Sequence, residues 1–278
     1  MHIFKTNHKV IVKYAGLLYS SPDWSWDSFI NREVLHREVL NDIQSITADS
    51  LLAHDLEQLC TPIANQEIWA SGVTYMRSKD ARMEESKDAG GGDFYARVYS
   101  AKRPELFFKS SAYRAVGSGG TVRIRKDSEW NVPEPELVLF ICSAGTIEGY
   151  MIGNDMSSRD IEGENPLYLP QAKSYDGAAA VGPCLYVPAT PISPDTEIQI
   201  EIWRGDVKVF VDAILISRMK RTHKELAHYL FMEMSFPAGV YLMTGTGIVP
   251  PDSFTLNYGD VIHITISNIG TLTNQVGK

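Results

Sequence analysis

The sequence predicts a mixed, β-rich (α+β) fold, with a small N-terminal α+β domain before a larger, mostly antiparallel β domain. Three observations predict this class. Many short segments alternate between apolar and polar residues, few segments have helical spacing, and strands and helices do not alternate regularly along the chain. A chain of 278 residues can hold one large domain with a small appendage, and we expect domains at 1–62 and 63–278.

The N-terminal part contains two kinds of short element. Residues 3–6 and 9–20 predict strands, and the leucines of residues 50–60 lie near helical spacing and predict a short helix. A turn then leads to a predicted strand at 67–75.

Residues 76–102 are polar and highly charged, and three glycines interrupt them at 90–92. One interpretation is a solvated helix with a surface loop. The other is a mobile lid over a site, because long charged loops in compact domains often act as lids.

The remainder of the chain is rich in strand patterns. Alternating or continuously apolar segments predict strands at 121–125, 136–142, 196–204, 208–216 and 261–269. The clearest helix is 222–234, where Thr222 and Glu225 have the spacing of a capping box. Its predicted core-facing residues are Leu226, Tyr229, Leu230 and Met234.

Composition excludes several classes of protein. The formal net charge of -8, without a basic stretch, argues against nucleic-acid binding, although it permits a small anionic substrate. The cysteines Cys60, Cys142 and Cys184 form no CxxC pair and are odd in number, which favours reduced thiols in the cytoplasm. No apolar run resembles a signal peptide or approaches the roughly 20 residues of a membrane helix. We therefore expect a cytoplasmic protein without a membrane partner.

The strongest chemical signal is the pair Glu134 and Glu136. Two residues apart in an extended chain, their carboxylates project from one face, and Pro133 and Pro135 favour that extended backbone. Such carboxylates repel each other, and a hard divalent cation relieves the repulsion. The alternative is that both glutamates face solvent at the start of a strand.

Asp155 adds a third carboxylate. Residues 149–155 predict a strand that returns beside 136–142 as a hairpin and brings Asp155 near the two glutamates. Oxygen-only ligands favour Mg²⁺, and Mn²⁺ or Ca²⁺ accept the same donors. Alternatively, Asp155 caps a turn or helix, and Arg159 with Asp160 forms a local ion pair.

Lys173 stands before a run of small residues that would let the chain pass close to a pocket. A lysine beside a metal-bound carbonyl acts as a base when its surroundings favour the neutral amine. The alternative is a surface lysine paired with Asp176.

Together these segments resemble the fumarylacetoacetate hydrolase superfamily. The resemblance rests on EPE at 134–136, NDMSSRD at 154–160, KSYDG at 173–177 and TGTGIVP at 244–250, and it covers residues 68–272. It implies a β-roll or sandwich around a metal held by Glu134, Glu136 and Asp155. It also implies a homodimer or homotetramer.

Further segments, at 103–109 and 164–177, resemble the branch that dehydrates 2-keto-3-deoxy sugar acids. The hydrolases of the superfamily usually carry a histidine and a glutamate on the lid, whereas residues 72–86 contain no histidine; Glu84 or Glu85 remains a possible substitute. The resemblance therefore implies conversion of 2-keto-3-deoxy-D-arabinonate or -xylonate to 2,5-dioxopentanoate.

In this reading Lys173 removes a C3 proton and Glu105 donates a proton to the leaving C4 hydroxyl; the alternative for Glu105 is a strand residue facing solvent. The expected substrate-binding residues are Lys109, Arg159, Thr244, Thr246 and Tyr75, and the alternative for TGTG is an ordinary tight turn.

Two other functions stay open. One is an acylpyruvate- or fumarylpyruvate-type carbon–carbon hydrolase or decarboxylase, and the other is a non-catalytic, metal-containing binding protein.

Overall fold

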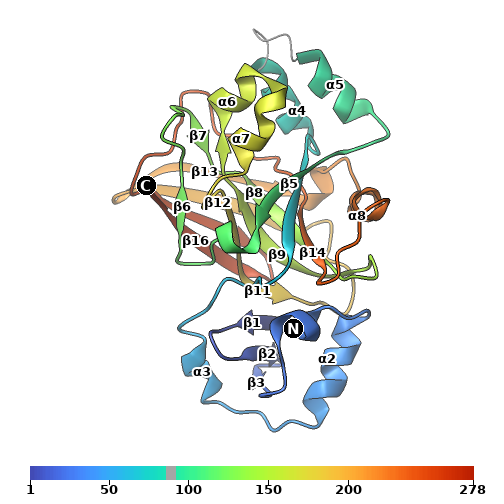
Figure 1. Cartoon of the computed structure of the whole chain (residues 1–278). Coiled ribbons are helices and arrows are strands. Elements are labelled where there is room, and N and C mark those ends of the chain that lie inside the picture. The colour runs from blue at the N-terminus through green and yellow to red at the C-terminus, as the bar shows by residue number, and fades with distance from the viewer. Residues whose placement is uncertain (86–91) are drawn as a thin grey trace.

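The computed structural model describes residues 1–85 and 92–278 (Figure 1). Gly90 and Gly91 of the predicted glycine loop lie outside these residues. Within them, nine strands form the main sheet in the order β3-β2-β1-β11-β9-β8-β14-β4-β5. Neighbouring strands are antiparallel except β14 and β4, which are parallel. The strands are β1 (His2–Lys5), β2 (Val10–Tyr14), β3 (Leu17–Tyr19), β4 (Glu67–Gly72), β5 (Glu105–Ser111), β8 (Pro135–Ile141), β9 (Ile147–Asp155), β11 (Ala179–Tyr186) and β14 (Val240–Met243).

A second sheet of five strands within the described residues packs against the main one. Its order is β13 (Val207–Leu215), β12 (Glu197–Arg204), β15 (Val261–Ile266), β16 (Gly270–Gly277) and β6 (Thr121–Arg123). A small third sheet pairs β10 (Ser157–Ser158) with β7 (Asn131–Val132). The expected mixed and mostly antiparallel β fold is confirmed.

The strand β8 separates two hydrophobic cores. Leu137 and Leu139 face the core between the two sheets, where isoleucines from alternate positions of β12 and β15 meet them. Val138 and Phe140 face the second core, under the N-terminal helices. This burial on both faces explains why residues 136–142 are continuously apolar instead of alternating.

The helices gather at the ends and flank of the β body (Figure 1). They are α1 (Trp26–Ile30), α2 (Leu35–Gln44), α3 (Leu52–Asp55), α4 (Met76–Glu85), α5 (Gly92–Ser100), α6 (Arg159–Glu164), α7 (Leu169–Lys173) and α8 (His223–Phe231), with short 3-10 turns η1 (Ala112–Arg114), η2 (Pro166–Tyr168) and η3 (Ile216–Arg218). Helices α4 to α7 lie at the opposite end of the molecule from the N-terminal strands. None of the helices in the described residues is long and apolar enough to cross a membrane.

The N-terminal strands join the main sheet through β1, which pairs with β11. The predicted helix at 50–60 is present as the short α3. The domain boundary at residue 62 stays a prediction.

Helix α8 begins as predicted. The backbone N–H of Glu225 donates to the Thr222 hydroxyl at 3.1 Å, but the Glu225 carboxylate pairs with Arg221 instead of returning to the cap. Leu226 and Leu230 are buried. The prediction for Met234 was wrong, since the helix ends at Phe231 and Met234 is 37% exposed.

Candidate metal centre and active site

The hairpin of β8 and β9 places three carboxylates together. Pro135 lies opposite Asn154, and the backbone N–H of Asp155 donates to the Glu134 carbonyl at 2.9 Å. Oxygen atoms of Glu134, Glu136 and Asp155 lie within 4.8 Å of one another. The glutamates are 3% and 1% exposed, so the solvent-facing alternative is wrong.

Three cationic side chains surround Glu134. Lys173 donates to Oε2 at 2.6 Å, while Arg159 and Arg82 donate to Oε1 at 2.7 and 3.0 Å. Burial alone would raise the pKa of Glu134, but the charges of Lys173, Arg159 and Arg82 hold this pKa well below its usual range. Glu134 is therefore ionised and already neutralised by protein groups.

Two lysines contact Asp155, so its side chain is not a turn or helix cap. The Lys109 Nζ lies 2.5 Å from Oδ1 and the Lys173 Nζ lies 3.2 Å from Oδ2. Lys173 is buried at the end of α7 and also donates to the Ser157 hydroxyl at 2.5 Å. The surface pairing of Lys173 with Asp176 is wrong, because Asp176 is exposed and pairs with Arg114 at 3.1 Å.

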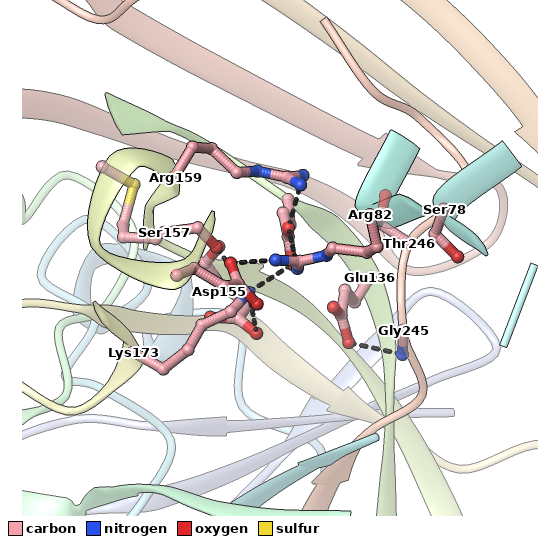
Figure 2. A network of polar contacts seen from close by, with 12 residues as sticks. Ser78, Arg82, Glu136, Asp155, Ser157, Arg159, Lys173, Gly245 and Thr246 are labelled. Atoms are coloured by element: carbon pink, nitrogen blue, oxygen red, sulfur yellow. Dashed lines mark hydrogen bonds and ion pairs between the residues drawn. The ribbon is translucent and has the colours of Figure 1, made fainter. Parts of the chain in front are cut away.

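Glu136 has a different environment. Within the described residues no lysine or arginine lies within ion-pair distance of it, and its Oε2 accepts a bond from the Gly245 N–H at 2.6 Å (Figure 2). Burial and the neighbouring charges of Asp155 and Glu134 raise the pKa of Glu136 well above its usual value. This carboxylate therefore lacks the positive charge that its neighbours have.

The turn that holds Gly245 is adapted to this contact. Gly245 has φ +91°, and a Cβ there would collide with the Thr74 hydroxyl and crowd the Ser71 carbonyl. TGTG is thus a tight turn that also supplies a donor to the site.

The three carboxylates fit a divalent cation. All the donor atoms are oxygens, the set most typical of Mg²⁺, Mn²⁺ or Ca²⁺ in proteins. A cation there would supply the missing positive charge beside Glu136.

A small cavity adjoins the carboxylates. The space between its walls totals about 350 Å³, part of which opens to solvent. The predicted site residues that line it are Glu105, Glu134, Glu136, Asp155, Lys173 and Thr246. Among the side chains of the described residues that line it, no histidine is present.

Glu105 begins β5 and faces this cavity, so the solvent-facing alternative is wrong. Its carboxyl group lies against Gly72, where a Cβ would collide with it. Burial raises the pKa of Glu105, and the nearby charge of Arg82 opposes this shift. The group is suited to hold a proton.

Of the five expected substrate-binding residues, Thr246 alone is among the described residues that line the cavity. Thr244 donates to the Leu137 carbonyl at 2.9 Å, and Tyr75 is buried, with its pKa raised by burial and the charge of Glu136. Lys109 contacts Asp155 and Arg159 contacts Glu134.

The local pairing of Arg159 with Asp160 is wrong. Asp160 instead accepts bonds from the Ser128 hydroxyl at 2.6 Å and the Glu129 N–H at 2.7 Å. Arg159 turns its guanidinium toward the carboxylate centre (Figure 2).

Sequence reasoning missed Ser78 and Arg82, which α4 extends into the cavity lining. The guanidinium of Arg82 joins Glu134 to Glu162 of α6. Ser78 and Arg82 are four residues apart and share one buried helix face, so α4 is not a fully solvated helix. This spacing of four residues was the sequence feature that could have identified the buried face of α4.

Comparison with known proteins matches residues 68–277 to the family described as fumarylacetoacetate (FAA) hydrolase C-terminal. A probable 2-keto-3-deoxyxylonate dehydratase of Haloferax volcanii is 46% identical over 216 residues, which are 77% of this chain and 73% of that protein. The 2-dehydro-3-deoxy-D-arabinonate dehydratase of Saccharolobus solfataricus is 40% identical over 251 residues, which are 89% and 84% of the two chains.

A solved structure of 2-keto-3-deoxy-D-arabinonate dehydratase complexed with magnesium and 2,5-dioxopentanoate is similar over 100% of this chain and 99% of that one. Its TM-score is 0.84 at 32% sequence identity. Because the family match spans most of the sequence and agrees with the carboxylate hairpin, the chain belongs to the fumarylacetoacetate hydrolase family.

Proposed function

We propose that this protein is a metal-dependent dehydratase (a hydro-lyase) that converts 2-keto-3-deoxy-D-arabinonate or -xylonate to 2,5-dioxopentanoate, a step of pentose oxidation. The observation that carries the proposal is the buried amine of Lys173 beside three clustered carboxylates, in one cavity with Glu105. The two dehydratase relatives and the product complex of the similar structure support the same reaction.

Glu134, Glu136 and Asp155 would hold Mg²⁺ or another hard divalent cation. When bound, such a cation polarises the keto group of the substrate and stabilises the negative charge that develops on its oxygen.

Lys173, in its neutral form, would receive the C3 proton. Its Nζ is fixed by Glu134, Asp155 and the Ser157 hydroxyl, at 2.6, 3.2 and 2.5 Å. Fixing the base in this way removes the entropy cost of aligning it with the C–H bond.

Glu105 supplies the second proton transfer. Burial raises its pKa and so favours the protonated form, which would give its proton to the C4 hydroxyl as that group leaves as water. The unsaturated 2-keto acid that remains reaches 2,5-dioxopentanoate by proton shifts that place the aldehyde at C5. The Thr246 hydroxyl and the Arg82 guanidinium, both in the cavity lining, would face the hydroxyl and carboxylate groups of the substrate.

The test is to incubate the purified protein with Mg²⁺ and each 2-keto-3-deoxy pentonate and to measure 2,5-dioxopentanoate. We expect Lys173→Ala to lower kcat by about 10²- to 10⁴-fold, the usual contribution of a general base. Mg²⁺ affinity, measured by calorimetry, should persist. Lys224→Ala, on the exposed side of α8, is the matched control.

Two outcomes would contradict the proposal. Unchanged turnover in Lys173→Ala would remove the lysine from the mechanism. Release of pyruvate from an acylpyruvate, without any dehydration, would make the protein a hydrolase instead. The histidine-free lining of the cavity, among the described residues, favours dehydration.

We also infer a homodimer or homotetramer that works in the cytoplasm. The strand β13 is an edge of its sheet, and Val211, Ala213 and Leu215 alternate along it and are exposed. An exposed apolar edge favours association with a second copy. The free thiols of all three cysteines favour a reducing compartment.

A further inference from the structure

Arg221 comes shortly before α8 in the sequence. In the folded chain its side chain contacts the C-terminal end of α5, which is far from it in sequence. Its guanidinium donates to the carbonyl oxygens of Val98, Ala101 and Lys102 at 3.0, 2.7 and 3.1 Å. The same group pairs with Glu225 at 2.7 Å, and the side chain is buried.

These carbonyls belong to the last turn of α5 and the residues that follow it. The last carbonyls of a helix have no partner within the helix, and a cation satisfies both their lone pairs and the negative end of the helix dipole. The neighbouring Lys220 also donates to the Tyr99 carbonyl and stacks over the Tyr99 ring at 4.3 Å. Arg221 and Lys220 therefore fasten the end of α5 to the start of α8.

Helix α5 carries Tyr95, which is buried and lines the catalytic cavity. Tyr95 and Glu105 also line a second, wider cavity with Val98, Arg103, Leu106 and Leu169. The two cavities thus share a wall formed by Tyr95 and Glu105. The position of this wall depends on where α5 lies.

We propose that Arg221 is a positioning residue: by holding the end of α5, it keeps Tyr95 as the wall that closes the catalytic cavity toward the second cavity. This wall limits the length of the substrate. The inference rests on the proposed dehydratase function. Arg221 is not among the described residues that line the catalytic cavity, and its guanidinium bonds the end of α5, so it acts through that helix.

A double-mutant cycle tests this path. Arg221→Gln and Tyr95→Ala are made singly and together, and kcat and KM are measured with five-carbon and six-carbon 2-keto-3-deoxy acids. We expect each single change to lower kcat/KM for the five-carbon acid about tenfold, mainly through KM, and to improve relative use of the six-carbon acid. The double variant should resemble the single ones, because linked residues are not additive.

Three further measurements separate positioning from loss of folding. Mg²⁺ affinity should equal that of the wild type, and hydrogen exchange of residues 95–100 should rise in Arg221→Gln. Arg221→Lys should recover part of the activity. Glu225→Gln is the matched control, since it removes the α8 partner of Arg221 and leaves the α5 carbonyl contacts.

Additive effects of Arg221→Gln and Tyr95→Ala would overturn the inference, as would unchanged exchange over residues 95–100. An equal loss in Glu225→Gln would also overturn it. If the wild type itself turns over neither acid, the proposed function is wrong; if it does and the cycle is additive, only the role of Arg221 is wrong.

Discussion

Glu136 differs from the two carboxylates beside it in what balances its charge. Glu134 and Asp155 contact lysine and arginine side chains, whereas Glu136 contacts the Gly245 N–H. An uncompensated buried carboxylate costs stability unless a cation arrives. Glu136 therefore favours metal binding and lowers the stability of the metal-free protein.

We expect Glu136→Gln to have opposite effects on two measurements. Mg²⁺ affinity, by calorimetry, should fall by at least about tenfold because a ligand charge is lost. The thermal stability of the protein in a chelator should rise, because the amide removes repulsion and its oxygen can still accept from Gly245. Glu134→Gln should lower both quantities, since it removes the negative charge that Lys173, Arg159 and Arg82 share. Unchanged Mg²⁺ affinity in both variants would exclude this centre.

Lys109 gives a second prediction, which separates structure from substrate contact. Its ammonium is buried and donates to the Met156 carbonyl at 2.9 Å. Burial lowers the pKa of Lys109, and the charge of Asp155 opposes this shift. Lys109→Met should destabilise the protein by about 3 kcal/mol, the usual cost of breaking a buried pair. Urea unfolding measures this loss. A raised KM with unchanged stability would restore Lys109 as a substrate contact.

The sequence was sufficient to predict that Glu134, Glu136 and Asp155 meet, because a hairpin brings them together. Lys173 was assigned to the site from the small residues after it and from the family resemblance. The sequence was not sufficient to predict that Lys109 and Arg159 pair with these carboxylates and do not line the cavity. A positive charge near a carboxylate cluster lies either in the cavity or behind the carboxylates, and packing decides which. Arg82 was missed because its position depends on how α4 packs over β8.

At the scale of elements, strands with alternating or continuous apolar patterns were predicted well, since those patterns are local. Helix α2 was missed although Leu35, Val39 and Ile43 have helical spacing and are buried. The parallel pairing of β14 with β4 could not be predicted, because no local pattern specifies which distant strands become neighbours.

His223, in the first turn of α8, predicts that the stability of the protein depends on pH. Burial lowers the pKa of His223 from 6.5 to about 4. The unfolded chain therefore binds this proton more readily than the folded one, so stability is full above pH 6.5 and is lost as pH falls toward 4. At pH 5 the loss should be up to about 2 kcal/mol.

Urea unfolding at pH 7 and pH 5 measures this loss. We expect His223→Gln to be less sensitive to the pH change than the wild type, while His54→Gln, at an exposed position, serves as control. Equal sensitivity in the wild type and His223→Gln would contradict the assignment.

At the scale of the whole molecule, the two sheets enclose one core, and β13 forms an edge of the smaller sheet. Val211, Ala213 and Leu215 are alternate residues of β13 beyond its bulge and are exposed, Val211 at 53% and Leu215 at 37%. Alternate residues of a strand point to one side, so these form an apolar row. A monomer gains nothing from exposing such a row.

We expect Val211→Lys to form a smaller species than the proposed oligomer, because a charge in the row opposes its burial. Light scattering after gel filtration measures the mass, and Val211→Ile should keep the wild-type assembly. The same mass for Val211→Lys and wild type would place the interface elsewhere.

The hairpin of β8 and β9 also bears on the order of events in folding. All three carboxylates of the candidate centre lie on or beside strands joined by a short turn, so they can meet before distant parts of the chain pack. The cavity walls from α4, α5 and the turn after β14 need contacts between residues far apart in sequence. A cation that binds the hairpin early would speed folding more than it slows unfolding.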